Sequence, residues 1–179
     1  MSLEGPRIRL APLRDEDSAA LFAWINDREL VLLNAAYKPV HEADHAAWFD
    51  AVRARDDVVI FGIRLVDGDD LIGSCQLLAI DPLHRTAELQ IRIGVAAARG
   101  RGHGSEAVGL LLRHGFGDLG LERVQLTVFA DNEAALRTYA KAGFTREGTL
   151  RSAAEIDGRR RDVVVMGILR EELEDGGAA

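Results

Sequence analysis

The spacing of apolar positions along the chain predicts strands before it predicts anything else. Residues 7–13 alternate between polar and apolar, and Pro12 ends the stretch as it would in an edge strand. Residues 58–65 are β-branched and apolar, which is typical of a central strand, and an Asp- and Gly-rich turn leads to the next apolar stretch as a hairpin. The predicted strands cover residues 7–13, 58–65, 71–80, 86–93 and 123–129, followed by a hairpin whose turn is 156–162.

Helical spacing of apolar residues alternates with these strands. Asp15 and its neighbours supply capping groups before an apolar helical face, and Gly143 is a suitable C-cap after a short helix. The predicted helices begin near Asp15, run from about 41 to 55, follow residue 104 as far as Phe116, and cover 134–142. Residues 172–179 are mostly small or charged, so we expect a frayed tail there.

Composition narrows the class of protein. The 179 residues are 47% hydrophobic and 28% charged, which fits one domain spanning 1–179 with a core of its own. A net charge of -7 disfavours nucleic acid as a partner. No N-terminal apolar segment indicates a signal peptide and no stretch is long enough to span a membrane, so we expect a cytoplasmic protein without a membrane partner. Cys75 is the single cysteine, and in an apolar strand it is expected to be a small core residue rather than a nucleophile.

A glycine-rich loop follows the strand at 86–93 and leads into a helix. Residues 99–104 read Arg-Gly-Arg-Gly-His-Gly. Glycine lets backbone amides approach a ligand, and the N–H groups at a helix N-terminus bind phosphate oxygens. A surface loop with basic side chains is the alternative. A Walker loop would need a lysine that this loop lacks, and a dinucleotide fingerprint would belong to a parallel unit early in the chain.

The segment after the loop favours a ligand-binding loop over the alternatives. Strand 123–129 ends close to Asn132, and Tyr139 lies seven residues later on the following helix. Two helical turns separate the two residues, so both side chains are expected on one face.

These segments carry a resemblance to a known family. The loop at 99–104 resembles the pyrophosphate loop of the GNAT N-acetyltransferase superfamily, and 132–144 resembles that superfamily's Asn-x-x-Ala-x-x-x-Tyr-x-x-x-Gly-Phe motif. The likeness covers nearly the whole chain. Residues 87–91, 148–151 and the Trp48-Phe49 pair after His45 look closest to the branch with spermidine acetyltransferases and ribosomal-protein N-terminal acetyltransferases.

The resemblance implies a fold and a cofactor site. It implies an α/β fold with a bent, mostly antiparallel mixed sheet of six or seven strands and about four helices. Acetyl-CoA, as co-substrate, would lie in a V between the strands 86–93 and 123–129, where a bulge typically splays them. The pantetheine arm would pair with the first of these strands, and Asn132 would anchor the cofactor's amide region. The implied cofactor-binding residues are Ile91, Ile93, Val95, Arg99, Gly100, Arg101, Gly102, His103, Gly104, Ser105, Asn132, Ala135 and Tyr139.

The implied reaction is direct attack of a primary amine on the thioester in a ternary complex. Tyr139 would protonate the departing thiolate, and a backbone N–H near Ile93 would stabilise the oxyanion. Glu88 would be a base or amine ligand, although it can equally be read as a surface carboxylate paired with Arg85 or Arg92. The histidines at 41, 45 and 84 lack metal-ligand spacing and are expected on the surface, so no metal site is predicted.

The acceptor stays open at this level. Acidic residues at 27, 29, 42 and 44 suit a polyamine or aminoglycoside, whereas the three arginines at 159–161 argue against a site built only for polycations. We therefore expect a small-molecule amine (polyamine, aminoglycoside or amino sugar) or a protein N-terminal amine. A non-catalytic acetyl-CoA sensor and a generic nucleotide-binding protein are the alternatives. An exposed sheet edge makes a homodimer a further expectation.

Overall fold

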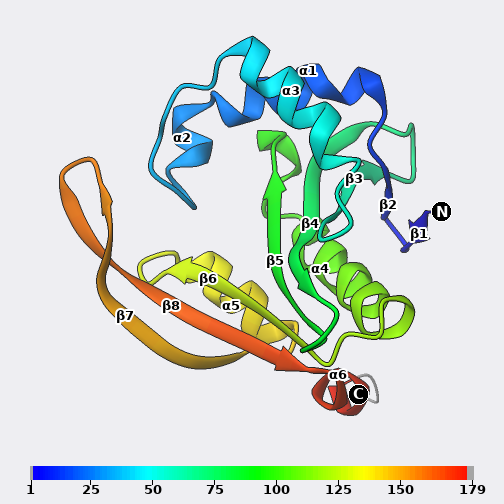
Figure 1. The fold of residues 1–179 in the computed structure, drawn as a ribbon, viewed down its shortest axis with the longest axis vertical. Coiled ribbons are helices and arrows are strands. Elements are labelled where there is room, and N and C mark those ends of the chain that lie inside the picture. The colour runs from blue at the N-terminus through cyan, green and yellow to red at the C-terminus, as the bar shows by residue number, and fades with distance from the viewer. Residues whose placement is uncertain (1, 177–179) are drawn as a thin grey trace.

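The computed structural model describes residues 2–176 and contains one mixed sheet of eight strands in the order β1-β2-β3-β4-β5-β6-β8-β7 (Figure 1). All neighbouring strands are antiparallel except β5 and β6, which run parallel. The strands are β1 (Leu3–Glu4), β2 (Ile8–Pro12), β3 (Val59–Leu65), β4 (Leu71–Asp81), β5 (Thr86–Ile93), β6 (Arg123–Phe129), β7 (Thr145–Ile156) and β8 (Arg159–Leu169).

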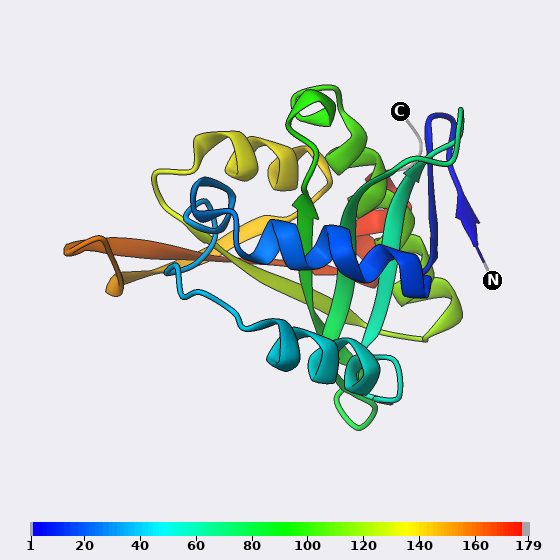
Figure 2. The ribbon, with the colours of Figure 1, turned by 90° about the horizontal axis from the view of Figure 1, so that it is seen from above.

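Helices cover both faces of this sheet (Figure 2). They are α1 (Ser18–Ile25), α2 (Arg28–Val31), α3 (Glu42–Val52), α4 (His103–Arg113), α5 (Glu133–Lys141) and α6 (Arg170–Gly176). α1 and α3 lie on one face, where Leu13, Leu21 and Phe49 form a small core cluster. The larger cluster lies on the other face, where α4 supplies Ala107, Val108 and the leucines that follow. None of the helices in residues 2–176 is long and apolar enough to cross a membrane.

The predicted fold class is confirmed, and the element count is higher than expected. The structure adds the two-residue strand β1 and the short helices α2 and α6 to the predicted set. These pieces are shorter than the stretches over which apolar periodicity can be recognised, so the pattern does not reveal them. The tail expected to fray from 172 instead continues α6 as far as Gly176, and 177–179 lie outside the described residues.

Strands β5 and β6 separate soon after they meet. Their parallel pairing covers only Thr86 to Glu88 on β5, opposite Arg123 to Gln125 on β6. The register of β4 against β5 is regular from Gly73↔Ile93 to Leu78↔Glu88, and the irregularity in that pair lies at the other end, before Asp81. The predicted V is therefore present, but it forms where β6 diverges and not at a register shift near Ile91.

The hairpin of β7 and β8 extends beyond the rest of the sheet and bends toward α2 (Figure 1). Arg28 on α2 forms an ion pair of 2.6 Å with Asp157 in the hairpin turn. Most of β7 is solvent-exposed, because no helix covers it and no strand pairs with its outer edge within the described chain. The ion pair therefore links α2 to the tip of the hairpin.

Candidate active site

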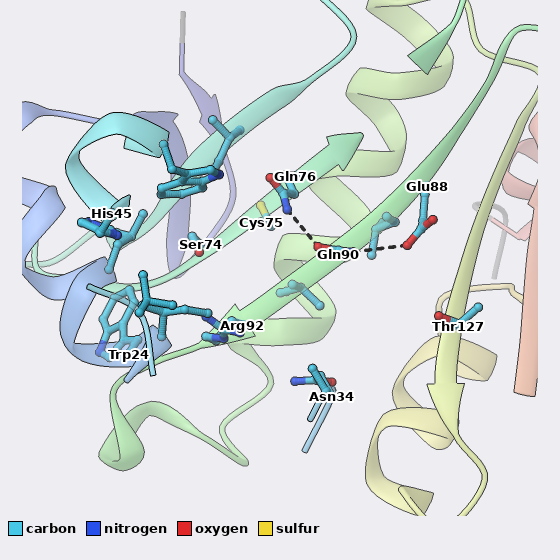
Figure 3. Close-up of a pocket in the computed structure, with 18 of the residues that line it drawn as sticks. Trp24, Asn34, His45, Ser74, Cys75, Gln76, Glu88, Gln90, Arg92 and Thr127 are labelled. Carbon is cyan, nitrogen blue, oxygen red and sulfur yellow. Dashed lines mark hydrogen bonds between the residues drawn. The ribbon is translucent and has the colours of Figure 1, made fainter. Parts of the chain in front are cut away.

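A cavity of about 530 Å³ lies between the α1–α3 layer and the centre of the sheet. Strands β4 and β5 form its floor, and Thr127 of β6 and Tyr139 of α5 reach it from across the V (Figure 3). Trp24, Trp48 and Asp44 line the helical side. The cavity thus joins the face covered by α1 and α3 to the gap between β5 and β6.

Polar side chains on the floor form a hydrogen-bonded row. Gln76 Nε2 donates to Gln90 Oε1 at 2.9 Å, and Gln90 Nε2 donates to Glu88 Oε1 at 3.2 Å. Alternation along β5 places Glu88, Gln90 and Arg92 on the same face of the sheet. The two amides therefore orient the Glu88 carboxylate, which points toward β6 in Figure 3.

The alternative interpretation of Glu88 as a surface ion-pair partner is wrong. Arg85 pairs with Glu122 at 2.9 Å, and Arg92 forms no ion pair with Glu88 or any other described carboxylate. Glu88 instead lines the cavity with its second carboxylate oxygen unused by the described protein groups. Its role in proton transfer stays a prediction.

Tyr139 lies on α5 and reaches the cavity from the side opposite Glu88. Its ring packs edge-on against Phe144, with 5.8 Å between centroids. Burial raises the pKa of Tyr139 to about 12, because the phenolate would lose its hydration. The side chain is therefore a neutral hydroxyl donor at physiological pH, and a base role is disfavoured.

The glycine-rich loop has the geometry of an anion cradle. Gly102, the N-cap of α4, has φ +82°, and Gly100 has φ +71°, both in the left-handed region that suits glycine. The first helical hydrogen bond runs from Glu106 N–H to the Gly102 carbonyl at 3.1 Å. The three preceding N–H groups, at 103–105, therefore have no intrahelical acceptor, and no side chain caps the helix.

The turn between β1 and β2 supports this loop from outside. Arg7 donates to the carbonyl of Arg101 at 2.7 Å and to that of Gly102 at 3.3 Å. The same guanidinium pairs with Glu106 at 2.8 Å, and Glu106 in turn accepts the backbone N–H of Arg7 and of Ile8 at 2.9 and 3.1 Å. The loop conformation therefore depends on a residue almost a hundred positions earlier in the chain.

Two further loop residues differ in what they offer a ligand. His103 Nδ1 is buried and has no described partner, so it is an orphaned polar atom at the start of α4. Arg99 uses two donors on the backbone, to the Ile93 carbonyl at 2.9 Å and the Gly94 carbonyl at 2.8 Å. Arg99 therefore shapes the junction of β5 and the loop, while Arg101 is exposed.

The free edge of β5 faces the V. Gly94 N–H bonds to Ile72 on β4, so strand alternation directs the backbone groups of Ile91 and Ile93 to the opposite edge. Arg99 already uses the carbonyl of Ile93, which leaves three backbone groups of these two residues for an added strand. Val95 differs, because its N–H bonds to Ile72 as well.

Asn132 is the N-cap of α5. Its Oδ1 accepts the N–H of Ala135 at 3.2 Å, and its Nδ2 donates to the Leu33 carbonyl after α2 at 3.3 Å. These bonds use Asn132 Oδ1, Asn132 Nδ2 and the N–H of Ala135. The contacts predicted between these two residues and a cofactor must therefore use the remaining hydrogen-bonding capacity. Asn132 also ties α5 to the segment beside the cavity mouth.

One expectation about the other cavity residues is wrong. His45 was expected on the surface but is 6% exposed, and its Nε2 contacts the Ser18 carbonyl at 2.9 Å. Trp48 is 41% exposed at the cavity rim, so it is not a core residue. Asp44 lines the cavity, whereas Asp27 caps α2 by accepting the Leu30 N–H. Burial raises the pKa of the Cys75 thiol, which agrees with a structural cysteine.

Sequence reasoning did not assign Arg7, Gln76, Gln90, Arg92 or Thr127 to the site. Alternation along β4 and β5 was the one available signal, since Gln76 and Gln90 interrupt apolar strands at positions that share the face of Glu88. Arg7 and Thr127 have no such signal, because their partners are set by tertiary packing.

Comparison with known proteins agrees with this geometry. A model of the acetyltransferase (GNAT) domain matches residues 7–145. An uncharacterized N-acetyltransferase of Bacillus subtilis, YoaA, is 31% identical over 171 residues, covering 94% of this chain and 96% of the relative. The spermidine N(1)-acetyltransferase of Vibrio cholerae is 35% identical over 103 residues, covering 58% of this chain and 59% of the relative.

A solved structure shows the same arrangement of elements. The crystal structure of spermidine N-acetyltransferase from Vibrio cholerae in complex with CoA and spermine has a TM-score of 0.87 and 25% sequence identity, covering 95% of this chain and 99% of that one. The matched region of the family model includes the loop at α4, the V and Tyr139. The chain therefore belongs to the GNAT acetyltransferase family and is an acetyl-CoA-dependent N-acetyltransferase.

Proposed function

We propose that the cavity is the acceptor site, in which a primary amine attacks the thioester of acetyl-CoA directly in a ternary complex. One observation carries this proposal: Glu88 and Tyr139 line the same cavity from opposite sides of the V, next to the free edge of β5. An amine held there has a carboxylate on one side and a phenol on the other.

The expected position of acetyl-CoA is based on polar groups that have no hydrogen-bond partner within the described protein. The N–H groups at the start of α4 and the orphaned His103 Nδ1 suit the pyrophosphate. The free backbone groups of Ile91 and Ile93 suit the pantetheine amides, which add to β5 like a strand. Acetyl-CoA supplies the activated acetyl group, so no acyl-enzyme on Cys75 is required.

The proton steps divide between two side chains. Glu88 accepts a proton from the acceptor ammonium, directly or through water, and so produces the neutral nucleophile. The C–N bond forms as the C–S bond breaks, and Tyr139 gives its proton to the departing thiolate. The amide nitrogen then gives its remaining extra proton to the Tyr139 phenolate, directly or through water, which restores the phenol. The proton on Glu88 is released to solvent. The raised pKa of Tyr139 fits this role, because the hydroxyl is fully protonated before the reaction.

The acceptor is a small-molecule amine (a polyamine, aminoglycoside or amino sugar) or a protein N-terminal amine. The spermidine acetyltransferases among the relatives support the small-molecule class. The volume of about 530 Å³ lies in the range of small-ligand sites. The cytoplasm stays our prediction for where the reaction occurs.

The test of the cofactor site uses a glycine that can be changed without strain. Gly104 is the second residue of α4, and a Cβ there would have its nearest contact at 3.9 Å. A carboxylate about 4 Å from a phosphate costs about 4 kcal/mol near a protein surface, so Gly104→Glu should weaken acetyl-CoA binding by more than about 100-fold. Isothermal titration of acetyl-CoA against both proteins measures this.

The matched control is Gly109→Glu, the same change on the same helix, where the nearest contact of a Cβ is 3.6 Å. Both changes replace a helical glycine and should raise or preserve the melting temperature. Equal affinity of the two variants for acetyl-CoA would remove α4 as the phosphate site. An amine screen with labelled acetyl-CoA that yields no acetylated product, despite binding, would leave only the cofactor site standing.

We also propose that the chain forms a homodimer through β7. This strand has twelve residues and an unpaired outer edge within the described chain, and exposed edges of such length favour pairing with another chain. Analytical ultracentrifugation at several concentrations tests this. A monomer at all concentrations contradicts the dimer without affecting the proposed reaction.

A further inference from the structure

Arg92 is an unpaired arginine in the wall of the cavity. It lies on β5, on the same face as Glu88 and Gln90, and its side chain forms no hydrogen bond or ion pair with any residue of the described chain. Its Nε is buried. Figure 3 draws Arg92 toward the end of the cavity where Trp24 lies, whereas Glu88 points toward β6.

The other arginines that are not fully exposed all have partners. Arg64 pairs with Asp17 at 2.5 Å, and Arg123 pairs with Glu147 at 2.5 Å. Arg9, Arg161 and Arg170 pair with Asp69, Asp131 and Glu122. Among the described residues, Arg92 is thus the one partly buried arginine whose side chain has no described partner.

An uncompensated charge of this kind is costly for the free protein. Burial lowers the pKa of Arg92, and no neighbouring carboxylate opposes that effect. Two carboxylates line the cavity, those of Glu88 and Asp44. Glu88 is not within ion-pair distance of Arg92, and Asp44 is exposed on α3 and pairs with no described cation. The protein therefore offers a planar cationic donor to whatever enters the cavity.

We propose that Arg92 binds a carboxylate of the acceptor, so that the substrate is a primary amine with an anionic group at its other end. This inference rests on the proposed function, since it takes Glu88 as the residue that receives the amine. Four residues along a strand separate the Cα atoms of Glu88 and Arg92 by about 13 Å. An ω-amino acid or a short peptide, whose amine and carboxylate lie at opposite ends, can place its amine beside Glu88 and its carboxylate on Arg92.

The chemistry of the two ends favours this orientation. A guanidinium binds a carboxylate through two parallel hydrogen bonds, which fix direction as well as charge. A diamine of the same length would bring a second ammonium group to Arg92 and be repelled. The site would therefore discriminate against spermidine-like acceptors, although the relatives include spermidine acetyltransferases.

The test compares three series of acceptors with four to eight carbons: ω-amino acids, α,ω-diamines and n-alkylamines. These differ only in the distal group, which is anionic, cationic or neutral. For the length that fits best, kcat/KM of the wild type should be at least about tenfold higher for the amino acid than for the diamine. Arg92→Gln should lower the amino acid value by about 10- to 100-fold and leave the alkylamine within about twofold.

Further variants separate binding from structure. Arg92→Lys keeps the charge but loses the fork of donors and should give an intermediate preference. Arg92→Gln removes an uncompensated charge, so its melting temperature should be unchanged or higher. Arg113→Gln is the matched control, because Arg113 is an exposed arginine without a described partner on α4, on the other side of the sheet.

Binding to the CoA-saturated protein makes the two proposals distinguishable. Titration of the best ω-amino acid should show affinity that Arg92→Gln loses, whether or not the acceptor is turned over. Arg92-dependent binding without turnover would contradict the proposed reaction and leave the carboxylate site intact. A diamine that is bound or acetylated as well as the amino acid, no measurable binding of any ω-amino acid, or an equal loss for all three series in Arg92→Gln would each overturn the inference.

Discussion

The buried ion pair between Asp17 and Arg64 should be a main support of the helical layer over the cavity. Asp17 precedes α1, and its Oδ1 accepts from Arg64 Nη2 of β3 at 2.5 Å. Both side chains are almost inaccessible, with 3% and 4% exposure. Asp17 Oδ2 also accepts the backbone N–H of Arg14 at 2.8 Å. The perturbation is Asp17→Asn, which keeps the shape and removes the charge.

The size of the effect follows from what the substitution leaves behind. Removing one partner of a buried ion pair costs about 3–5 kcal/mol, because the remaining charge is uncompensated. Asp69 reduces this cost, since its Oδ1 lies 3.9 Å from Arg64 Nε and its carbonyl accepts from Arg64 Nη1 at 3.0 Å. We therefore expect a loss of about 3 kcal/mol, near the lower end of that range.

Thermal unfolding followed by circular dichroism measures this loss. For a chain of this length, 3 kcal/mol corresponds to a fall in melting temperature of about 6–12 °C. The double variant Asp17→Leu/Arg64→Met should recover most of the stability, because it leaves neither charge buried. The exposed pair Arg137–Glu133 is the control, and Arg137→Ala should change stability by less than about 0.5 kcal/mol. A fall of less than about 2 °C for Asp17→Asn would refute the reasoning.

Three further predictions concern the site. Tyr139→Phe should lower kcat by about 100-fold with little change in acetyl-CoA affinity, because only the proton donor is lost. The pKa of Tyr139 is raised to about 12, so the wild type minus Tyr139→Phe difference spectrum should show almost no phenolate at pH 10, where an ordinary tyrosine is about half ionised. The raised pKa also contributes to the free energy of unfolding. This contribution is fully present below about pH 10 and is lost as pH rises toward 12. Arg7→Met should raise the Kd for acetyl-CoA about tenfold in titration calorimetry, because the carbonyls of the α4 loop lose their donor.

Each of these has an outcome that contradicts it. Unchanged kcat in Tyr139→Phe would remove Tyr139 as the acid and leave water as the proton source. A phenolate signal from Tyr139 at pH 10 would mean that the ring is more hydrated than its burial indicates. Equal acetyl-CoA affinity for wild type and Arg7→Met, in a folded variant, would show that the loop holds its conformation without Arg7.

The sequence predicted a helix or strand correctly where the residues of that element alone carry the periodic or apolar pattern. The β-branched apolar run at residues 58–65 and the helical spacing after residue 104 depend on neighbours within one element, so strand β3 and helix α4 were predicted. The short α2 and α6 were missed because their residues do not complete a periodic pattern. His45 was misplaced on the surface. Trp48 and Phe49 follow it at helical spacing, but the contacts with Phe22 and the Ser18 carbonyl come from α1, whose position beside α3 only the tertiary structure shows.

The sequence by itself determined the family and singled out the glycine-rich loop and Tyr139 as candidate site residues, because these lie in two short contiguous motifs at residues 99–104 and 132–144. Only the tertiary structure decided which charges remain unpaired. From the sequence, Arg85 and Arg92 were equal candidates to form an ion pair with Glu88. In the structure, Arg85 pairs with Glu122, and the side chain of Arg92 has no described partner in the cavity. The physical reason is that ion pairing depends on distances of a few ångströms between separate strands, which periodicity along one strand does not encode.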